Sequence, residues 1–217
     1  MNQLRNVFDV PLTELTKPVT EALLLDVLAE ARFTPSAANL QPWAFVSLTT
    51  PERIQLLADH SLNALGLPMP NHRNLAIVNV AHLVLVCIDV LRAKCRFGDR
   101  GLDVFAVQDV AAAVHTVRIA AHAKGIASHW IRELEFGKIE TELGLAPRLR
   151  LQGALAFGLL DTSGLERPPH LEPEHFVFSE GTALRAAAEG AAALVVPTGE
   201  RSLHDDGRSS GQEAGTS

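Results

Sequence analysis

The sequence predicts an α+β fold, in which helices and strands alternate around one hydrophobic core. The chain has 217 residues, of which 47% are hydrophobic, and this is enough to bury one sizeable core. Segments with the 3.6-residue period of an amphipathic helix alternate with short apolar runs typical of strands. After Asp161 the periodicity ends. We therefore expect one domain over residues 1–162, with its core over about residues 18–161.

The first half of the predicted domain contains two helices, each followed by a strand. Thr20 is a suitable N-cap for the first helix, whose apolar residues recur at i, i+3, i+4 and i+7 until a proline-containing loop. An apolar strand is expected over residues 43–48. Thr50 and Pro51 then begin the second helix, as its cap and its first-turn proline. The β-branched and leucine-rich run over residues 83–88 is typical of a central strand.

The second half begins with the longest periodic segment, residues 103–124. Alanines and valines cover most of its circumference. A helix this apolar is buried or lies in a subunit interface. Gly125 is suited to end it. A strand over residues 126–131, a short helix over 136–143 and a strand over 151–160 complete the predicted domain.

The C-terminal part of the chain has a different composition. Residues 163–196 are predicted to form an extended surface arm with a short alanine-rich helix over 182–194. Residues 197–217 are rich in glycine, serine and charged residues, so we expect them to be disordered.

Charge and cysteine content narrow the class of protein. The net charge of −6 argues against nucleic acid or an anionic membrane as the main partner, since both favour a basic surface, and it leaves a small-molecule substrate. Cys87 and Cys95 form no disulfide framework, which suits a reducing compartment. Residues 1–10 lack the apolar core of a signal peptide, and residues 75–91 are too polar and short to span a bilayer. We expect a soluble, cytoplasmic protein.

A loop between the first helix and the first strand offers the clearest candidate site. Pro35, Ser36, Asn39 and Gln41 combine fixed backbone with one hydroxyl and two amide groups. Such groups match the rim of a flat heterocycle with alternating N–H and C=O groups. The same residues are also common in an ordinary turn after a helix, for backbone reasons alone. Both interpretations fit the spacing.

The loop sequence P-S-x-x-N-x-Q-P-W, followed by an apolar strand, resembles the flavin-binding signature of the nitroreductase family. Three later segments, residues 96–101, 108–113 and 120–130, resemble the family's core motifs in the same order. The resemblance covers about residues 18–161. It implies a three-layer α-β-α sandwich and an intertwined homodimer, with the helix over residues 103–124 at the interface.

The resemblance also implies a cofactor and a reaction. Family members bind FMN between two subunits and transfer electrons from NADH or NADPH to a nitroaromatic, a quinone or another planar acceptor. Because the flavin carries the chemistry, we expect no catalytic side chain. The cofactor-binding positions carried over are Pro35, Ser36, Asn39 and Gln41 in the loop, Ile131, Arg132 and Glu133 after a strand, and Arg167 in the arm. Arg132 either lies at the edge of the flavin or faces solvent.

One departure from the family pattern stands out. The family carries an arginine-rich segment that grips the FMN phosphate, but the matching residues 8–15 contain no basic residue. Charge-assisted contacts contribute roughly 1.5–3 kcal/mol each, so their loss would weaken FMN binding strongly unless Lys17, Arg73 or Arg167 compensates. The alternative function is therefore a redox-inactive protein of this fold that binds a flavin-like molecule as a carrier, sensor or structural partner.

Two further expectations concern metals and the acceptor. His115 and His122 lie seven residues apart on one face of the predicted helix, and His129 lies in the next predicted strand. This spacing does not identify a complete set of metal ligands, so no metal site is expected. Residues 67–74 and 94–102 are short segments beside the expected site, which predicts an open pocket. Phe97 and Phe105 either stack on a planar acceptor or pack in the core.

Overall fold

The computed structural model describes residues 7–62, 67, 72–162 and 164–177. Its contacts divide the chain into residues 1–168 and residues 169–217. The first unit contains a four-stranded antiparallel sheet. Its strands, in spatial order, are β1 (Trp43–Leu48), β2 (His82–Asp89), β4 (Leu149–Leu159) and β3 (Ile126–Ile131). β2 and β4 are therefore interior strands, as the apolar run in β2 predicts, and β1 and β3 are the edges of this sheet.

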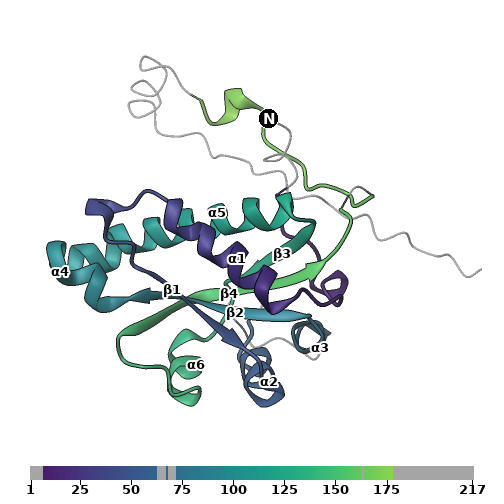
Figure 1. The fold of residues 1–217 in the computed structure, drawn as a ribbon, viewed down its shortest axis with the longest axis horizontal. Helices are drawn as coiled ribbons and strands as arrows, with labels where there is room; N and C mark the ends of the chain where they lie inside the picture. Colours follow the sequence, from purple (N-terminus) through teal and green to yellow (C-terminus); the bar gives the residue numbers. More distant parts are fainter. Residues whose placement is uncertain (1–6, 63–66, 68–71, 163, 178–217) are drawn as a thin grey trace, which may run out of the picture. The chain divides into compact units, whose positions relative to one another are not determined.

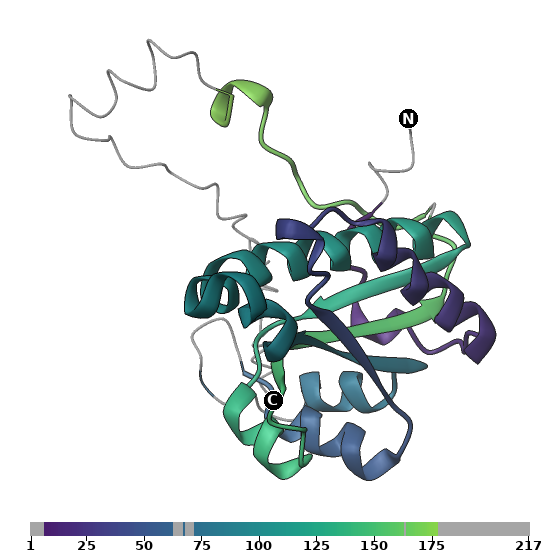
Figure 2. The same ribbon diagram turned by 60° about the vertical axis from the view of Figure 1, so that its left-hand side comes forward.

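Helices cover both faces of the sheet (Figures 1 and 2). One face carries α1 (Glu21–Ala29) and α5 (Ala106–Ala123), and the other carries α2 (Pro51–Asp59), α3 (His72–Val78) and α6 (Phe136–Glu142). Because successive strand residues point to opposite faces, β2 contributes alternately to two cores. Val84, Val86 and Ile88 belong to the core under α5, which we call the first core. Leu83, Leu85 and Cys87 belong to the second core, on the opposite face. The predicted three-layer sandwich is confirmed.

The segment before α5 differs from the prediction. Residues 90–100 form a helix, α4 (Val90–Arg100), which was not among the predicted elements. Asp89 explains it, because its side chain accepts hydrogen bonds from the N–H groups of Leu91 and Arg92 and so caps the helix. A single π-helical turn, η5 (Gly101–Phe105), joins α4 to α5. The long helix therefore begins at Ala106, three residues later than predicted.

The run from α4 through α5, Val90–Ala123, is long and apolar enough to cross a membrane by length and composition. Its inner face contacts the sheet instead, where Val110, Val114 and Val117 are buried in the first core.

The four strands lie within two residues of their predicted bounds, whereas the helix α3 was not predicted. The second helix ends at Asp59, and residues 63–66 lie outside the described part of the chain. Both cysteines are free, Cys87 in the core and Cys95 on the surface of α4. In the second unit the described residues end at 177 and include one short 3-10 turn, Pro173–His175. The predicted helix over 182–194 and the predicted disordered tail lie outside the described residues.

Candidate functional site

The loop before β1 has an unusual backbone. After α1 and a 3-10 turn, Glu30–Phe33, the chain enters the loop, in which Ala38, Asn39 and Gln41 have φ values of 49°, 56° and 47°. Left-handed conformations cost L-residues about 1–2 kcal/mol each, and asparagine tolerates them better than alanine or glutamine. Surrounding contacts must therefore hold this loop in place.

Contacts to α5 hold the first part of the loop. The N–H of Ala37 donates to the carboxylate of Asp109 over 3.1 Å. Thr34, just before the loop, donates its hydroxyl to Thr116 over 2.9 Å. Burial raises the pKa of Asp109, and the hydrogen bond from Ala37 partly offsets this effect. The loop is thus fixed to the helix that forms the first core.

The predicted ligand-binding side chains also bond to one another. The backbone N–H of Gln41 donates to the hydroxyl oxygen of Ser36 over 3.0 Å. The side-chain amide of Gln41 donates to the side-chain oxygen Oδ1 of Asn39 over 3.1 Å. These bonds leave the Ser36 hydroxyl proton, the Asn39 NH₂ group and the Gln41 side-chain carbonyl for a ligand. The loop therefore presents donors and an acceptor close together, as a heterocycle rim requires. Trp43, which follows them, packs in the first core.

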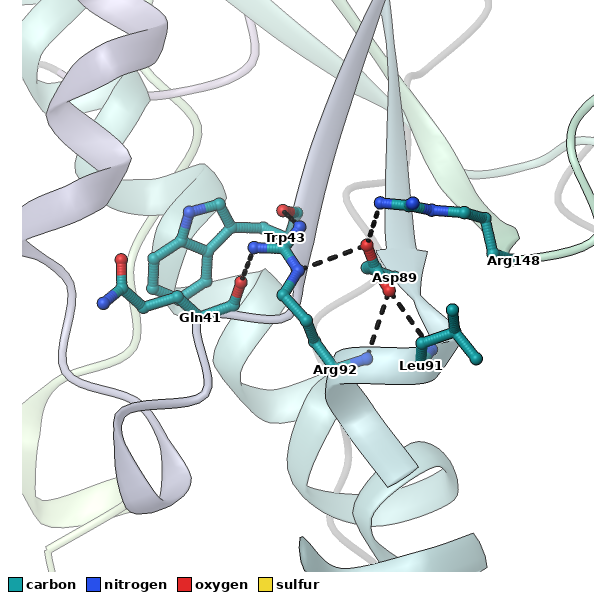
Figure 3. Close-up of polar contacts among 6 residues, drawn as sticks. All are labelled: Gln41, Trp43, Asp89, Leu91, Arg92 and Arg148. Carbon is teal, nitrogen blue, oxygen red and sulfur yellow. Dashed lines mark hydrogen bonds and ion pairs between the residues drawn. The ribbon is translucent and has the colours of Figure 1, made fainter. Parts of the chain in front are cut away.

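Arg92 holds the end of the loop (Figure 3). Its guanidinium donates to the backbone carbonyl of Gln41 and, over 2.8 Å, to that of Trp43. The carbonyl of the intervening Pro42 accepts the N–H of Asp89 over 2.7 Å. Asp89 in turn contacts the Arg92 Nε over 3.2 Å and Arg148 over 2.7 Å. Asp89 is only 1% exposed, and both of its carboxylate oxygens have partners inside the protein: Oδ1 accepts the N–H groups of Leu91 and Arg92, and Oδ2 contacts the two guanidinium groups.

Asp89 is ionised in this arrangement. Burial alone would raise the pKa of its carboxyl group, but hydrogen bonds from Arg92 and Arg148 and the positive charge of Arg92 lower it overall below its ordinary value. The buried negative charge is therefore matched by two guanidinium groups.

The predicted residues after β3 lie at the opposite edge of the sheet. Arg132 lies over the ring of Trp130, with 5.0 Å between the guanidinium carbon and the ring centroid. The N–H of Arg132 makes a long hydrogen bond of 3.4 Å to the Glu133 carboxylate, and the Glu133 carbonyl accepts the N–H of Leu62. Ile131 is fully buried at the end of β3.

An acidic residue, Asp9, lies along this edge in the segment that lacks arginines. Its carboxylate accepts the N–H of Trp130 over 3.0 Å and pairs with Arg118 over 2.8 Å. Burial lowers the pKa of Arg118, Asp9 raises it, and the nearby charge of Arg132 lowers it. Arg118 also donates to the Ser128 hydroxyl over 3.1 Å. The charge of Arg118 is thus matched by Asp9 within the chain.

The structure brings only part of the predicted site together. Pro35, Ser36, Asn39 and Gln41 share the loop at the β1 edge, whereas Ile131 ends β3 and Arg132 and Glu133 follow it. Three strand spacings separate these edges, which is about 14 Å. Arg167 is exposed after β4, and no polar contact within the described residues joins it to either group. The two groups of predicted residues therefore do not meet within one sheet edge.

Sequence reasoning missed Asp89, Arg92 and Asp109. An acid directly between an apolar strand and a helix is an available signal for Asp89 as an N-cap. Arg92 has no such signal, because its carbonyl partners lie 51 and 49 residues earlier in the chain.

The aromatic pair beside the loop is half-buried. Phe97 and Phe105 meet edge to face with centroids 5.1 Å apart, and they line a small void together with Leu40 and Pro42. The residues expected to leave the site open, 94–102, belong to α4 and η5. Helical segments therefore flank the loop on this side.

A larger hollow than the void beside the loop lies elsewhere in the described structure. A groove of about 470 Å³ is lined by Lys17, His122, Gly125 and residues 159–162, at the end of the sheet away from the loop. It includes Lys17, one of the cations considered for the FMN phosphate, but none of the predicted cofactor-binding residues. Among the described residues no group of three or more His, Cys, Asp or Glu side chains is placed to hold a metal ion.

Comparisons with known proteins agree with this fold. The sequence model of the Nitroreductase family matches residues 15–159. A protein of Archaeoglobus fulgidus, provisionally named an NADH dehydrogenase/NAD(P)H nitroreductase, is 26% identical over 136 residues, which are 61% of this chain and 69% of that protein.

Two solved structures share the fold at low sequence identity. A nitroreductase family protein from Streptococcus pneumoniae TIGR4 has a TM-score of 0.68 at 16% identity, with 82% of this chain and 98% of that chain covered. A protein of Exiguobacterium sibiricum 255-15, solved in complex with FMN, has a TM-score of 0.68 at 14% identity, with 83% and 96% covered.

Proposed function

Because the chain belongs to the nitroreductase family, we propose that it is an FMN-dependent oxidoreductase that transfers electrons from NADH or NADPH to a planar acceptor such as a nitroaromatic or a quinone. When bound, FMN would supply the redox chemistry by accepting a hydride and passing the electrons on. The protein's own residues would bind the ring, orient it and set the charge around it.

The geometry of the loop is the observation that supports this proposal most directly. The Ser36 hydroxyl, the Asn39 NH₂ group and the Gln41 side-chain carbonyl remain available on a backbone that internal hydrogen bonds hold. This combination of donors and acceptor fits the alternating N–H and C=O rim of a flavin ring. A preorganised loop also binds without the entropic cost of ordering itself.

The phosphate group of FMN fits less well. Within residues 8–15 the charged groups are carboxylates, and Asp9 is already held by Arg118 and the N–H of Trp130. Arg132 is the cation at this edge that pairs with no carboxylate through its side chain in the described contacts. We propose that Arg132 provides positive charge at the flavin edge, and that Arg167 contributes to phosphate binding from the arm.

The proposed site needs two subunits. The loop and Arg132 lie at opposite edges of one sheet, so a homodimer in which α5 lies at the interface would bring the loop of one copy to Arg132 of the other. We further propose that the arm beginning at residue 163 wraps the partner. The free cysteines suit a cytoplasmic location for this dimer.

Absorbance spectroscopy tests the cofactor. Purified protein titrated with FMN is expected to show a bound-flavin visible band, which NADH or NADPH bleaches in the absence of oxygen. Asn39→Ala should weaken FMN binding, because it removes the NH₂ group that the loop leaves free. Unchanged affinity in this variant would contradict the assigned role of the loop.

Asp9 favours a second function, in which the protein keeps the fold and binds a flavin-like molecule without redox turnover. Its carboxylate lies in the segment where a phosphate ligand would need positive charge. Bound flavin that NADH and NADPH leave oxidised would support this alternative. If the flavin is reduced, a panel of quinones and nitroaromatics then defines the acceptor, and turnover of several planar acceptors is expected.

A further inference from the structure

We propose that Arg92, oriented by Asp89, is a positioning residue that sets the conformation of the ligand-binding loop. This inference rests on the proposed function for its effect on flavin, but its structural part can be tested without any ligand. Neither residue contacts the Ser36, Asn39 or Gln41 side-chain groups that remain available.

Three consecutive carbonyls at the end of the loop are all held from one place in the fold. Arg92 bonds those of Gln41 and Trp43, and the N–H of Asp89 bonds that of Pro42. Asp89 and Arg92 are three residues apart at the junction of β2 and α4. The junction thus fixes the direction of three successive peptide groups.

Fixing these peptides determines where the Gln41 side chain points. In Figure 3 the Gln41 carbonyl faces Arg92, while its side-chain amide points away from Arg92. Gln41 has a φ of 47°, a conformation that glutamine rarely adopts without support. If the Gln41 carbonyl lost its donor, the peptide would be free to rotate toward an extended conformation. The Gln41–Asn39 hydrogen bond would then be lost as well.

Asp89 orients the guanidinium for this task. One carboxylate oxygen caps α4, and the other contacts Arg92 and Arg148. The Arg92 side chain is 44% exposed, so packing alone does not hold it. A planar fork that contacts a carboxylate and two carbonyls at once is a geometry that arginine provides and lysine does not.

Arg148 offers a matched control. Its guanidinium contacts the same Asp89 oxygen, and among the described contacts its side chain touches no carbonyl of the loop. Arg92→Ala and Arg148→Ala therefore remove the same charge from the same carboxylate, but only Arg92→Ala releases the loop. Arg92→Lys keeps the positive charge and loses the fork.

The first measurement is hydrogen–deuterium exchange of ligand-free protein, read on peptides that cover residues 36–43. Arg92→Ala should raise the exchange rate of these amides at least about tenfold, while Arg148→Ala leaves it near the wild-type rate. Equal rates in wild type and Arg92→Ala, or equal acceleration in both alanine variants, would overturn the proposal.

The second measurement is FMN affinity by fluorescence titration of the same proteins. Arg92→Ala should weaken binding about tenfold or more, Arg148→Ala less than about twofold, and Arg92→Lys should fall between wild type and Arg92→Ala. Full rescue by lysine would show that charge alone matters and would contradict the positioning role. Wild-type protein that binds no FMN would contradict the proposed function, and the exchange measurement would still decide the role of Arg92.

Discussion

Gly158 in β4 is a residue whose smallness the fold requires. A Cβ atom at this position would lie 2.8 Å from the backbone of Leu15, which is fully buried, so the neighbour cannot rotate away. Gly158→Ala should lower the free energy of unfolding by about 1–3 kcal/mol, as overpacking does in well-packed cores. Urea denaturation provides the measurement.

Gly137 in α6 is the control for this prediction. A Cβ atom there meets no atom within 4 Å, so Gly137→Ala should be neutral or stabilise by up to about 1 kcal/mol through helix propensity. Equal destabilisation in both variants would mean that close packing against Leu15 is not the cause.

The two cysteines should differ strongly in reactivity. Burial raises the pKa of the Cys87 thiol to about 12, with a further contribution from Glu140, whereas Cys95 is exposed on α4. Since the thiolate is the reactive form, a disulfide reagent at mildly alkaline pH should label one thiol in native protein and the second only after unfolding. Cys95→Ser should abolish the fast phase, and Cys87→Ser should leave it unchanged. Fast labelling of both thiols would contradict the buried position of Cys87.

At the scale of elements, His60 links α2 to α6 and to the segment after β3. Its ring nitrogens lie 3.1 Å from Glu135 and 3.1 Å from Glu142. Burial alone would lower the pKa of His60, but hydrogen bonds and charge from both glutamates raise it overall above 6.5. The link is therefore strongest when the imidazole is protonated.

The sign of the pH effect follows from this direction. A pKa raised in the folded state stabilises the protein fully below 6.5, and the contribution is lost as pH rises through the folded value. At pH values well below 6.5, His60→Gln should lower the temperature of the unfolding midpoint. At clearly alkaline pH the substitution should have little effect. Thermal unfolding of both proteins across this range tests it, and a midpoint difference that does not change with pH would exclude the ionic link.

At the scale of the whole molecule, the protein is expected to be a dimer. Val107 lies on α5, the predicted interface helix, and is 39% exposed in the single chain, as an apolar interface residue would be. Val107→Glu should shift the protein toward monomer in sedimentation equilibrium and weaken flavin binding, because the proposed site needs both copies. Leu75→Glu on α3 replaces an equally apolar exposed residue on the other face of the sheet and should leave the dimer intact. Monomeric wild-type protein at micromolar concentration would refute the dimer.

Much of the fold was predictable from local patterns. The strands and most helices have a period or apolar run that any short window contains, and these segments lie close to their predicted bounds. The helices α3 and α4 were missed, because α3 has only seven residues, and α4 has few apolar residues and a start that depends on one capping residue, Asp89. The loop with Ser36, Asn39 and Gln41 was found for the same local reason, since its chemistry is contained in a few neighbouring residues.

The sequence by itself therefore determined the α+β class, the order of the elements and the candidate ligand-binding loop. Only the tertiary structure decided the strand order β1-β2-β4-β3, which puts the loop and Arg132 at opposite edges. It also decided that Arg92 holds the Gln41 carbonyl and that Asp9 pairs with Arg118. The physical reason is that hydrogen bonds and ion pairs between distant residues depend on where folded elements pack, and no local period encodes that placement.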